Sequence, residues 1–313
     1  MAATAAPLPH SALRQVKLLF ALSRTPHGVL DIATPAVAAL LWYGFLPPFG
    51  IILLGLITAF AGYTAVYALN DLADYRVDKK KLASGGFKET KNYLDAVLIR
   101  HPVACGLLTF KEGLWWTVGW ALLALTGAYL LNPLCMLIFL IACLLETIYC
   151  LLWKTSPLRV FISGAVKTSG GIAAVFAVDP HPSPPFIALL FFWLFFWEIG
   201  GQNIPADWTD IEEDRLLQAK TIPLQLGPRG ATWMIISSLI SALVLNTALL
   251  RLSHLEIKLP LMIAAACAGL YLLLLPAYGL FKKQEESRAA ILFNKASYYP
   301  LALLVIVGFA TVI

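Results

Sequence analysis

Residues 51–78 read IILLGLITAFAGYTAVYALNDLADYRVD. The first part is apolar and long enough to cross a membrane, and the last eight residues follow the pattern D-x-x-D-x-x-x-D. On a helix this spacing would place Asp71, Asp74 and Asp78 on one face. The pattern recurs after another apolar stretch, at Asp207, Asp210 and Asp214. Only 18 of the 313 residues are acidic, so two such clusters beside membrane spans predict a site for hard divalent cations and their phosphate ligands.

The composition is that of a polytopic membrane protein. Hydrophobic residues make up 59% of the chain and charged residues 13%, whereas soluble domains carry about 25% charged residues. We therefore predict an all-α membrane fold, with one domain over residues 1–313 and about nine transmembrane helices in a bundle. The expected spans are residues 22–45, 51–70, 115–131, 134–153, 160–178, 186–204, 231–250, 259–281 and 290–312.

The distribution of positive charge predicts the orientation of these spans. Suppose that the N-terminus and the connections after the second, fourth, sixth and eighth spans lie on one side. Every lysine and arginine then falls on or next to that side except Arg251 and Lys258, and the positive-inside rule makes it cytoplasmic. Both aspartate motifs lie there. The net charge of +5 is explained by this topology, so we expect no nucleic-acid partner.

Two of the cytoplasmic connections, residues 79–113 and 205–230, are long for ties between packed helices, and we expect them to form caps over the bundle. The recurring motif indicates an internal repeat, in which the first four spans correspond to the next four. Both copies of the motif are reached from the non-cytoplasmic side, so the repeat would be parallel. A cation-coordinating membrane transporter is the alternative function, but it predicts carboxylates near the midplane and an inverted repeat.

Neighbouring carboxylates on a helix need a counter-charge. Mg²⁺ supplies it, and usually takes substrate phosphates as further ligands. We expect Asn70 and Asn203 to add neutral oxygen ligands. The basic residues that the topology places within reach of the phosphates are Lys79, Lys154, Arg159, Arg215 and Lys220.

A diphosphate held by metal is a good leaving group, and an allylic diphosphate would ionise to a delocalised carbocation. That cation needs a chamber that excludes water and presents aromatic faces. The aromatic residues that the spans offer for this purpose are Tyr63, Tyr67, Tyr149, Trp153, Phe192, Phe196 and Trp197.

Four ionisable residues fall inside the predicted spans, where charge is costly and is by default a sign of function. Glu146 and Lys167 lie at similar depth on consecutive antiparallel spans, so an internal ion pair between them is one interpretation. Glu198 lies in the same half of the membrane. Asp31 has no evident partner in the sequence, which makes it the candidate for contacting an acceptor.

The chain resembles the UbiA superfamily of intramembrane aromatic prenyltransferases. Residues 70–78, NDLADYRVD, match the family's first motif, N-D-x-x-D-x-x-x-D, and residues 210–214, DIEED, match its second, D-x-x-x-D. Residues 220–227, KTIPLQLG, and residues 23–26, SRTP, also fit the family pattern. The resemblance therefore covers nearly the whole chain.

The resemblance implies a bundle of helices around a central cavity that is open sideways to lipid. It also implies Mg²⁺-dependent transfer of a polyprenyl group from its allylic diphosphate to an aromatic or other lipophilic acceptor. The residues that it assigns to metal and diphosphate are Asn70, Asp71, Asp74, Asp78, Asp210 and Asp214. To these we add Asp207, one turn before the second motif, as a metal ligand or a residue that holds one.

Three features depart from the family pattern. Many members have Y-x-x-x-K between the fourth and fifth spans, whereas here Tyr149 and Lys154 are five apart, so either Lys154 or Arg159 could fill the basic role. Residues 79–100 lengthen the first cytoplasmic connection before residues 101–106, HPVACG, which resemble the family's usual segment after the motif. No arginine lies deep within the first two spans, which argues against a hydroxybenzoate-type acceptor.

Overall fold

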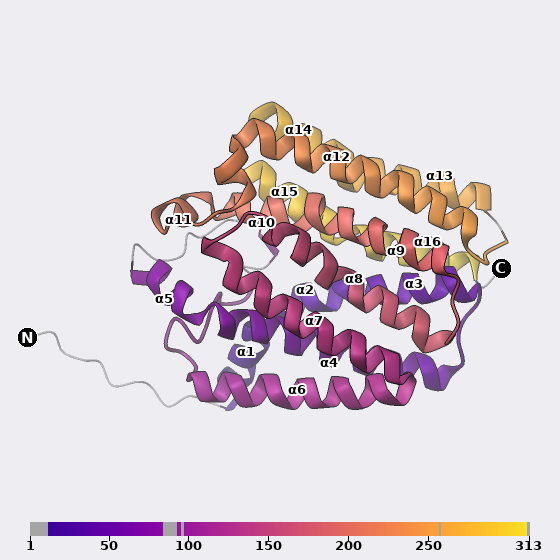
Figure 1. Cartoon of the computed structure of the whole chain (residues 1–313), viewed down its shortest axis with the longest axis horizontal. Coiled ribbons are helices and arrows are strands. Elements are labelled where there is room, and N and C mark those ends of the chain that lie inside the picture. Colours follow the sequence, from indigo (N-terminus) through magenta and orange to yellow (C-terminus); the bar gives the residue numbers. More distant parts are fainter. Residues whose placement is uncertain (1–11, 84–92, 95–96, 257, 312–313) are drawn as a thin grey trace, which may run out of the picture.

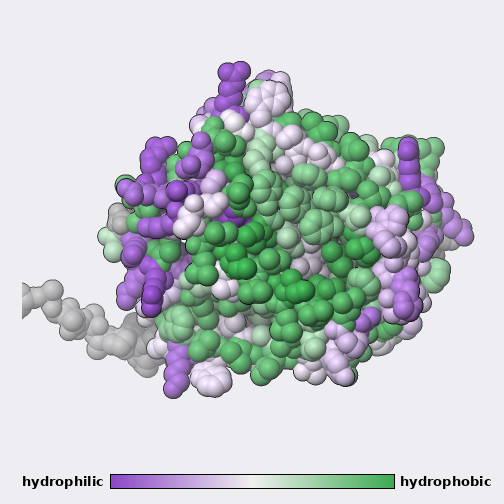
Figure 2. Space-filling model, in the orientation of Figure 1, coloured by the Kyte–Doolittle hydropathy of each residue, from purple (hydrophilic) through white to green (hydrophobic). Residues whose placement is uncertain are grey.

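The computed structural model describes residues 12–311 apart from 84–92, 95, 96 and 257. This part of the chain is helical and contains no β-strand, and eight of its helices are long and apolar enough to cross a membrane. The all-α membrane fold predicted from the composition is therefore confirmed. Hydrophilic side chains gather at the two ends of the molecule, with an apolar band between them (Figure 2).

Each predicted span corresponds to one helix or to two consecutive helices. The first span is broken after Asp31, because Pro35 has no N–H to donate to the Asp31 carbonyl. For this reason eight long helices are found where about nine spans were expected. In span order the helices are α2 (Thr25–Asp31) with α3 (Ala33–Tyr43), α4 (Phe49–Ala73), α6 (Phe110–Leu131), α7 (Pro133–Leu151), α8 (Arg159–Val178), α9 (Pro184–Trp197), α12 (Ile222–Leu252), α13 (Lys258–Gly269) with α14 (Leu275–Lys283), and α15 (Glu286–Ser297) with α16 (Tyr299–Ala310).

Shorter helices flank the spans. They are α1 (Ala12–Leu22), α5 (Tyr75–Ala83), the 3₁₀ turn η2 (Leu152–Lys154), α10 (Ile204–Thr209) and α11 (Ile211–Leu216), with two π-helices, η3 (Glu198–Asn203) and η4 (Leu270–Leu274). Residues 205–230, predicted as a connection, hold most of α10, all of α11 and the start of α12. Within the other predicted cap, residues 79–113, positions 84–92, 95 and 96 lie outside the described residues.

Local sequence explains several helix boundaries. The Thr109 side chain accepts a hydrogen bond from the backbone of Glu112, and the Glu112 carboxylate accepts one from the backbone of Thr109, which forms a capping box at the start of α6. Asn132 ends α6 and caps α7, and Pro133 follows at the first helical position. α3 ends at Gly44, whose left-handed backbone (φ 84°) suits glycine.

The spans pack side by side into a closed bundle (Figure 1). α4 packs against α6, α7 against α8, and α9 against α12. The last helix, α16, packs against α3, so the first and last spans are neighbours. α5 and α11, the short helices of the two aspartate motifs, lie at the same end of the bundle (Figure 1).

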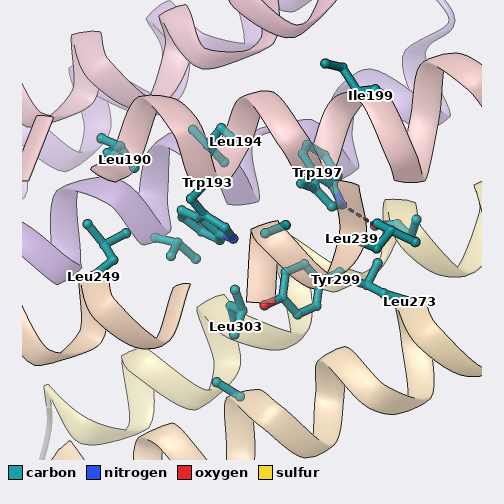
Figure 3. Packing of buried hydrophobic residues seen from close by; sticks show 14 of the residues in the cluster. Leu190, Trp193, Leu194, Trp197, Ile199, Leu239, Leu249, Leu273, Tyr299 and Leu303 are labelled. Carbon is teal, nitrogen blue, oxygen red and sulfur yellow. Dashed lines mark hydrogen bonds between the residues drawn. The ribbon is translucent and has the colours of Figure 1, made fainter. Parts of the chain in front are cut away.

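The two halves of the bundle differ in how their interiors are filled. In the C-terminal half, helices α9, α12 and α16 bury a continuous apolar core around Trp193, Trp197 and Tyr299 (Figure 3). In the N-terminal half, helices α2, α3, α4, α6, α7 and α8 surround a cavity of about 480 Å³, which η3, α10, α15 and α16 also line. Packing in the C-terminal half holds α9 in place, and α9 leads into the second aspartate motif. The cavity in the N-terminal half leaves space for a ligand.

Candidate active site

Each aspartate motif spans a break between two helices. The break falls at Asp74 between α4 and α5, and at Asp210 between α10 and α11. The first aspartate of each motif precedes the break and the third follows it, so the prediction of one continuous helical face is wrong. All six carboxylates nevertheless converge on one pocket of about 120 Å³, which we call the head pocket. Its charged lining residues are Asp71, Asp74, Asp78, Asp207, Asp210 and Asp214, with Arg24, Lys81, Arg100, His101 and Arg159.

His101 links the first and third carboxylates of the first motif. Its Nδ1 lies 2.7 Å from Asp71 Oδ1 and 2.8 Å from Asp78 Oδ2. Burial alone would lower the pKa of His101, but the two carboxylates outweigh it and raise that pKa to about 9. The imidazole is therefore protonated at neutral pH. His101 also has a left-handed backbone (φ 51°), a strained conformation that clusters at functional sites.

The first motif fits a divalent cation. Ligand atoms of Asp71, Asp78 and His101 all lie within 4.8 Å of one another. Asp71 Oδ2 is buried and accepts no hydrogen bond from any described residue. Several hard carboxylate oxygens in one small pocket suit Mg²⁺, and the imidazolium supplies the positive charge there in the metal-free protein.

The second motif is paired with basic side chains from the connection between the second and third spans. Lys81 Nζ lies 2.9 Å from Asp214 Oδ1, and Arg100 Nη2 lies 3.0 Å from Asp210 Oδ2. Although burial opposes them, Arg100 and Lys81 hold the pKa of Asp210 below its ordinary value. At Asp214 burial prevails over Lys81 and raises the pKa to about 7. Burial likewise raises the pKa of Asp74 to about 6.

Asp207 forms a buried ion pair with Arg159 in the head pocket. Arg159 Nη2 donates to Asp207 Oδ1 at 2.6 Å, and the two residues are 5% and 7% exposed. The guanidinium also lies 4.4 Å from the centre of the Tyr149 ring. The structure thus places Asp207 in the site, where a guanidinium neutralises it.

The structure separates the basic residues that the sequence singled out. Arg159 lines the head pocket, whereas Lys154 and Lys220 are exposed and lie outside it. Lys79 and Arg215 are exposed as well. Of the two candidates left open for the basic role beside Tyr149, the geometry therefore favours Arg159. The basic residues that the sequence reasoning did not select are Arg24, Lys81, Arg100 and His101.

The two asparagines lie beside the larger cavity. Asn70 lines both the head pocket and this cavity, and its Nδ2 donates to Glu146 Oε1 at 2.6 Å. Asn203 lines the larger cavity, and its Nδ2 donates to the Tyr149 hydroxyl at 2.9 Å. Asn203 Oδ1 is buried and accepts no hydrogen bond from the described residues. Both amides are therefore fixed near the junction of the two spaces.

The larger cavity continues from the head pocket into the membrane-spanning part of the bundle. Arg24, Asn70 and Tyr149 line both spaces, so the two adjoin. Most of its lining is apolar, and it reaches Leu46 and Leu56, which are 55% and 47% exposed at the surface of the bundle. A long apolar chain attached to a polar head would fit this pair of spaces.

Of the seven aromatic residues proposed to line the chamber, four line at least one of the two spaces. Tyr63, Tyr67 and Tyr149 line the larger cavity, and Trp153 lines the head pocket. The other three candidates are absent from the lining of both spaces among the described residues. Phe192 is exposed, Phe196 packs against the apolar core, and Trp197 is buried within that core.

The ionisable residues within the spans form different pairs from those expected. Lys167 Nζ lies 2.6 Å from Asp31 Oδ2 and 3.9 Å from Glu198 Oε2. The interpretation of a Glu146–Lys167 pair is wrong, because Lys167 pairs with Asp31 at the end of α2 and Glu146 accepts a hydrogen bond from Asn70. Asp31 therefore has a partner, and it does not belong to the cavity lining. Asp31 was proposed to contact the acceptor because it had no evident partner, and that reason no longer holds.

The π-helix η3 brings polar residues of the sixth span to the cavity. Its wider turn stacks residues five apart, so Glu198 and Asn203 face the same way, and both line the cavity with Gln202. A Cβ atom at Gly200 would lie 2.9 Å from the Ile235 carbonyl oxygen of α12. Only glycine therefore lets this segment approach α12 so closely.

Comparison with known proteins agrees with this geometry. A model of the UbiA prenyltransferase family matches residues 32–304. The chain belongs to the UbiA prenyltransferase family. Among curated proteins none matches the chain. The family resemblance inferred from the motifs is therefore confirmed.

Several solved structures share the fold of this UbiA family member. An apo UbiA homologue from Aeropyrum pernix K1 aligns with a TM-score of 0.69 at 19% identity, over 91% of this chain and 97% of that one. A structure described for digeranylgeranylglyceryl phosphate synthase gives 0.67 at 17% identity, over 95% and 99%. A UbiA homologue from Archaeoglobus fulgidus bound to DMAPP and Mg²⁺ gives 0.64 at 16% identity, over 92% and 99%. At these identities the likeness establishes the fold.

One of the missed residues of this UbiA family member carried a signal in the sequence. His101 begins HPVACG, the segment that resembles the family's usual continuation after the first motif. Lys81 and Arg100 carried no such signal, because their partners lie more than 100 residues away in the second motif. Long-range pairing of this kind depends on how the helices are arranged.

Proposed function

We propose that the chain transfers a polyprenyl group from an allylic polyprenyl diphosphate to an aromatic or other lipophilic acceptor, with Mg²⁺, at the cytoplasmic face. Family membership supports prenyl transfer, and A. fulgidus homologues of the same fold have been solved with DMAPP or GPP and Mg²⁺. One observation carries the proposal. A pocket lined by six carboxylates adjoins a largely apolar cavity of about 480 Å³.

The head pocket would hold the diphosphate. When bound, Mg²⁺ neutralises the phosphate charge and makes diphosphate a better leaving group. The residues that we assign to metal are Asp71, Asp74, Asp78, Asp207, Asp210 and Asp214. The basic residues that pair with these carboxylates, among them Lys81, Arg100 and Arg159, would turn to the phosphate oxygens, to which guanidinium and ammonium groups bind strongly.

The larger cavity would take the prenyl chain and protect the allylic carbocation. Its apolar lining excludes water, which would otherwise capture the cation. Tyr63, Tyr67 and Tyr149 line it beside the head pocket, where aromatic faces can stabilise a cation. The acceptor would reach the same space from the lipid through the side at which Leu46 and Leu56 are exposed.

The alternative of a cation transporter is less well supported by the arrangement of charge. Transport would favour carboxylates near the middle of the bundle. Here all six aspartates of the motifs lie at helix ends, around the breaks at Asp74 and Asp210. An acidic site at one end of the bundle suits a bound head group better than an ion path.

The test is diphosphate release by the purified, detergent-solubilised protein, supplied with geranylgeranyl diphosphate and a panel of lipophilic acceptors, with and without Mg²⁺. We expect release to require Mg²⁺ and to fall about 100-fold or more in Asp71→Asn and Asp210→Asn, because each substitution removes a charged metal ligand. Asp179→Asn is the matched control at the opposite end of the bundle. If folded protein releases no diphosphate with any chain length, the proposal is wrong.

A further inference from the structure

A group of polar side chains lies within the membrane-spanning part of the bundle, beside the larger cavity. Lys167 is at its centre, with Nζ 2.6 Å from Asp31 Oδ2, 3.5 Å from the Tyr67 hydroxyl and 3.9 Å from Glu198 Oε2. Tyr67 donates to Asp31 Oδ2 at 2.5 Å, and Ser163 donates to Glu198 Oε1 at 2.9 Å. We call these five residues the Lys167 cluster.

Two oxygen atoms at this cluster have no hydrogen-bond partner among the described residues. They are Glu198 Oε2 and the hydroxyl of Tyr63, and both atoms are buried. Glu198 is 8% exposed, and both residues line the cavity. The Tyr63 hydroxyl lies against α8, 2.9 Å from where a Cβ atom of Gly170 would be, one turn from Lys167. Buried polar atoms are normally paired, so these two atoms point to a polar ligand.

The cluster lies about one helical turn below the junction of the two spaces. Tyr67 precedes Asn70 by three residues on α4, a rise of about 4.5 Å. Glu198 precedes Asn203 by one turn of the π-helix. Asn70 lines both spaces. A diphosphate in the head pocket would therefore hold its allylic carbon close to the cluster.

The charges of the cluster favour a neutral ligand that can donate a hydrogen bond. Asp31 is already neutralised, because Lys167 Nζ lies 2.6 Å from its Oδ2. The carboxylate that remains open to the cavity is Glu198, which would repel an anion in this apolar setting. A hydroxyl group can donate to Glu198 Oε2 and accept from Tyr63.

We propose that the Lys167 cluster binds the acceptor through an uncharged hydroxyl group, as in a phenol or an alcohol, and disfavours acceptors that carry a carboxylate. Glu198 and Tyr63 contact the hydroxyl, while Asp31 and Lys167 position Glu198. This inference rests on the proposed function, because it assigns the acceptor class for that reaction.

The test compares matched acceptors in the purified protein with geranylgeranyl diphosphate and Mg²⁺. The pairs are hydroquinone with 4-hydroxybenzoate, and 1-octanol with octanoate. We expect the neutral member of each pair to be prenylated with the lower KM. In Glu198→Gln the KM for the neutral acceptor should rise about tenfold, because glutamine replaces a charged hydrogen-bond acceptor by a weaker, neutral one. The KM for the prenyl diphosphate should stay within about twofold of wild type.

Two further variants separate acceptor binding from a general structural effect. Tyr63→Phe keeps the ring and removes the hydroxyl, and it should also raise the KM for the neutral acceptor. Thr168→Val is the control, because the Thr168 hydroxyl bonds to Ala165 within α8 and Thr168 is not in the cavity lining. Thr168→Val should leave both KM values unchanged.

Three results would overturn the inference and leave the proposed function intact. They are faster use of the carboxylate member of each pair, an unchanged KM for the neutral acceptor in Glu198→Gln, and release of diphosphate without prenylation of any neutral acceptor. Absence of Mg²⁺-dependent diphosphate release would instead refute the proposed function, and this inference with it.

Discussion

Replacing His101 with asparagine tests whether basic side chains take the place of the metal in the metal-free protein. Asparagine tolerates the left-handed backbone of this position, so the change removes the imidazolium without adding strain. The pKa of His101 is raised from 6.5 to about 9. At about 1.4 kcal/mol per pKa unit, this shift corresponds to about 3 kcal/mol, which is the net of the attraction of Asp71 and Asp78 and the opposing cost of burial.

Because the pKa of His101 is raised, the stability difference between wild type and His101→Asn depends on pH in a defined direction. A group whose pKa is raised by folding contributes fully below its unfolded pKa, about 6.5 for histidine, and its contribution is lost as pH rises through the folded value. In EDTA at about pH 6, we expect wild type to exceed His101→Asn by up to about 3 kcal/mol in free energy of unfolding. Above about pH 10 the contribution of the imidazolium should be absent, so the difference should fall by the same amount.

The measurement is unfolding of both proteins in detergent with EDTA, at the two pH values, followed by intrinsic fluorescence. His181→Asn is the control, because His181 is an exposed histidine far from the head pocket. Adding Mg²⁺ and diphosphate together should reduce the difference at low pH, because the metal then supplies the positive charge. Equal stability of wild type and His101→Asn at low pH, or a difference that is as large at high pH, would refute the reasoning.

Three further predictions concern the head pocket. Asp207→Leu should lower the free energy of unfolding by about 3–5 kcal/mol, because it leaves the buried Arg159 without its carboxylate partner. The double variant Asp207→Leu with Arg159→Met should recover most of this loss in a double-mutant cycle of thermal unfolding. Mg²⁺ affinity, measured by calorimetry, should rise as pH rises through about 7, because Asp214 must lose its proton to bind metal. Lys154→Ala and Lys220→Ala should keep diphosphate release within about twofold of wild type, because both residues are exposed outside the pocket.

Each of these has a result that would contradict it. A double variant of Asp207 and Arg159 as unstable as the single variant would show that the ion pair is not the cause. A flat Mg²⁺ affinity between about pH 6 and 8 would mean that Asp214 does not compete for protons with the metal. A large loss of activity in either lysine variant would mean that this lysine does take part in diphosphate binding or release.

The sequence predicted the membrane spans and the two motifs because both are local properties of the chain. A run of about 20 apolar residues suffices to identify a span, and the aspartates are identified by spacing alone. The breaks at Asp74 and Asp210 were missed because the spacing fits an unbroken helix equally well. The six carboxylates still line one pocket, because the chain turns toward that pocket at both breaks.

The pairing of charges could not be read from the sequence. Depth alone favoured Glu146 as the partner of Lys167, since the two residues lie on consecutive spans. The actual partner is Asp31, because α8 also packs against α3, which is distant in sequence and begins two residues after Asp31. The rotation of each helix then decides which neighbour a side chain meets. The same reason explains why Arg159 rather than Lys154 reaches the head pocket. Lys154 ends η2 and Arg159 begins α8, so the turn between these two elements separates their side chains.

The π-helix at Glu198–Asn203 changes the direction in which the later side chains of the sixth span point. An α-helix turns by about 100° per residue, so the one additional residue in this turn rotates everything after it relative to everything before it. Upstream, Trp193 and Trp197 point into the filled half of the bundle. Downstream, Asp207 points into the head pocket. Deleting Gly201 would remove this extra residue and turn the second motif away from the first, even though every carboxylate would still be present. The rotation of this helix, as well as its composition, therefore brings the two aspartate motifs together.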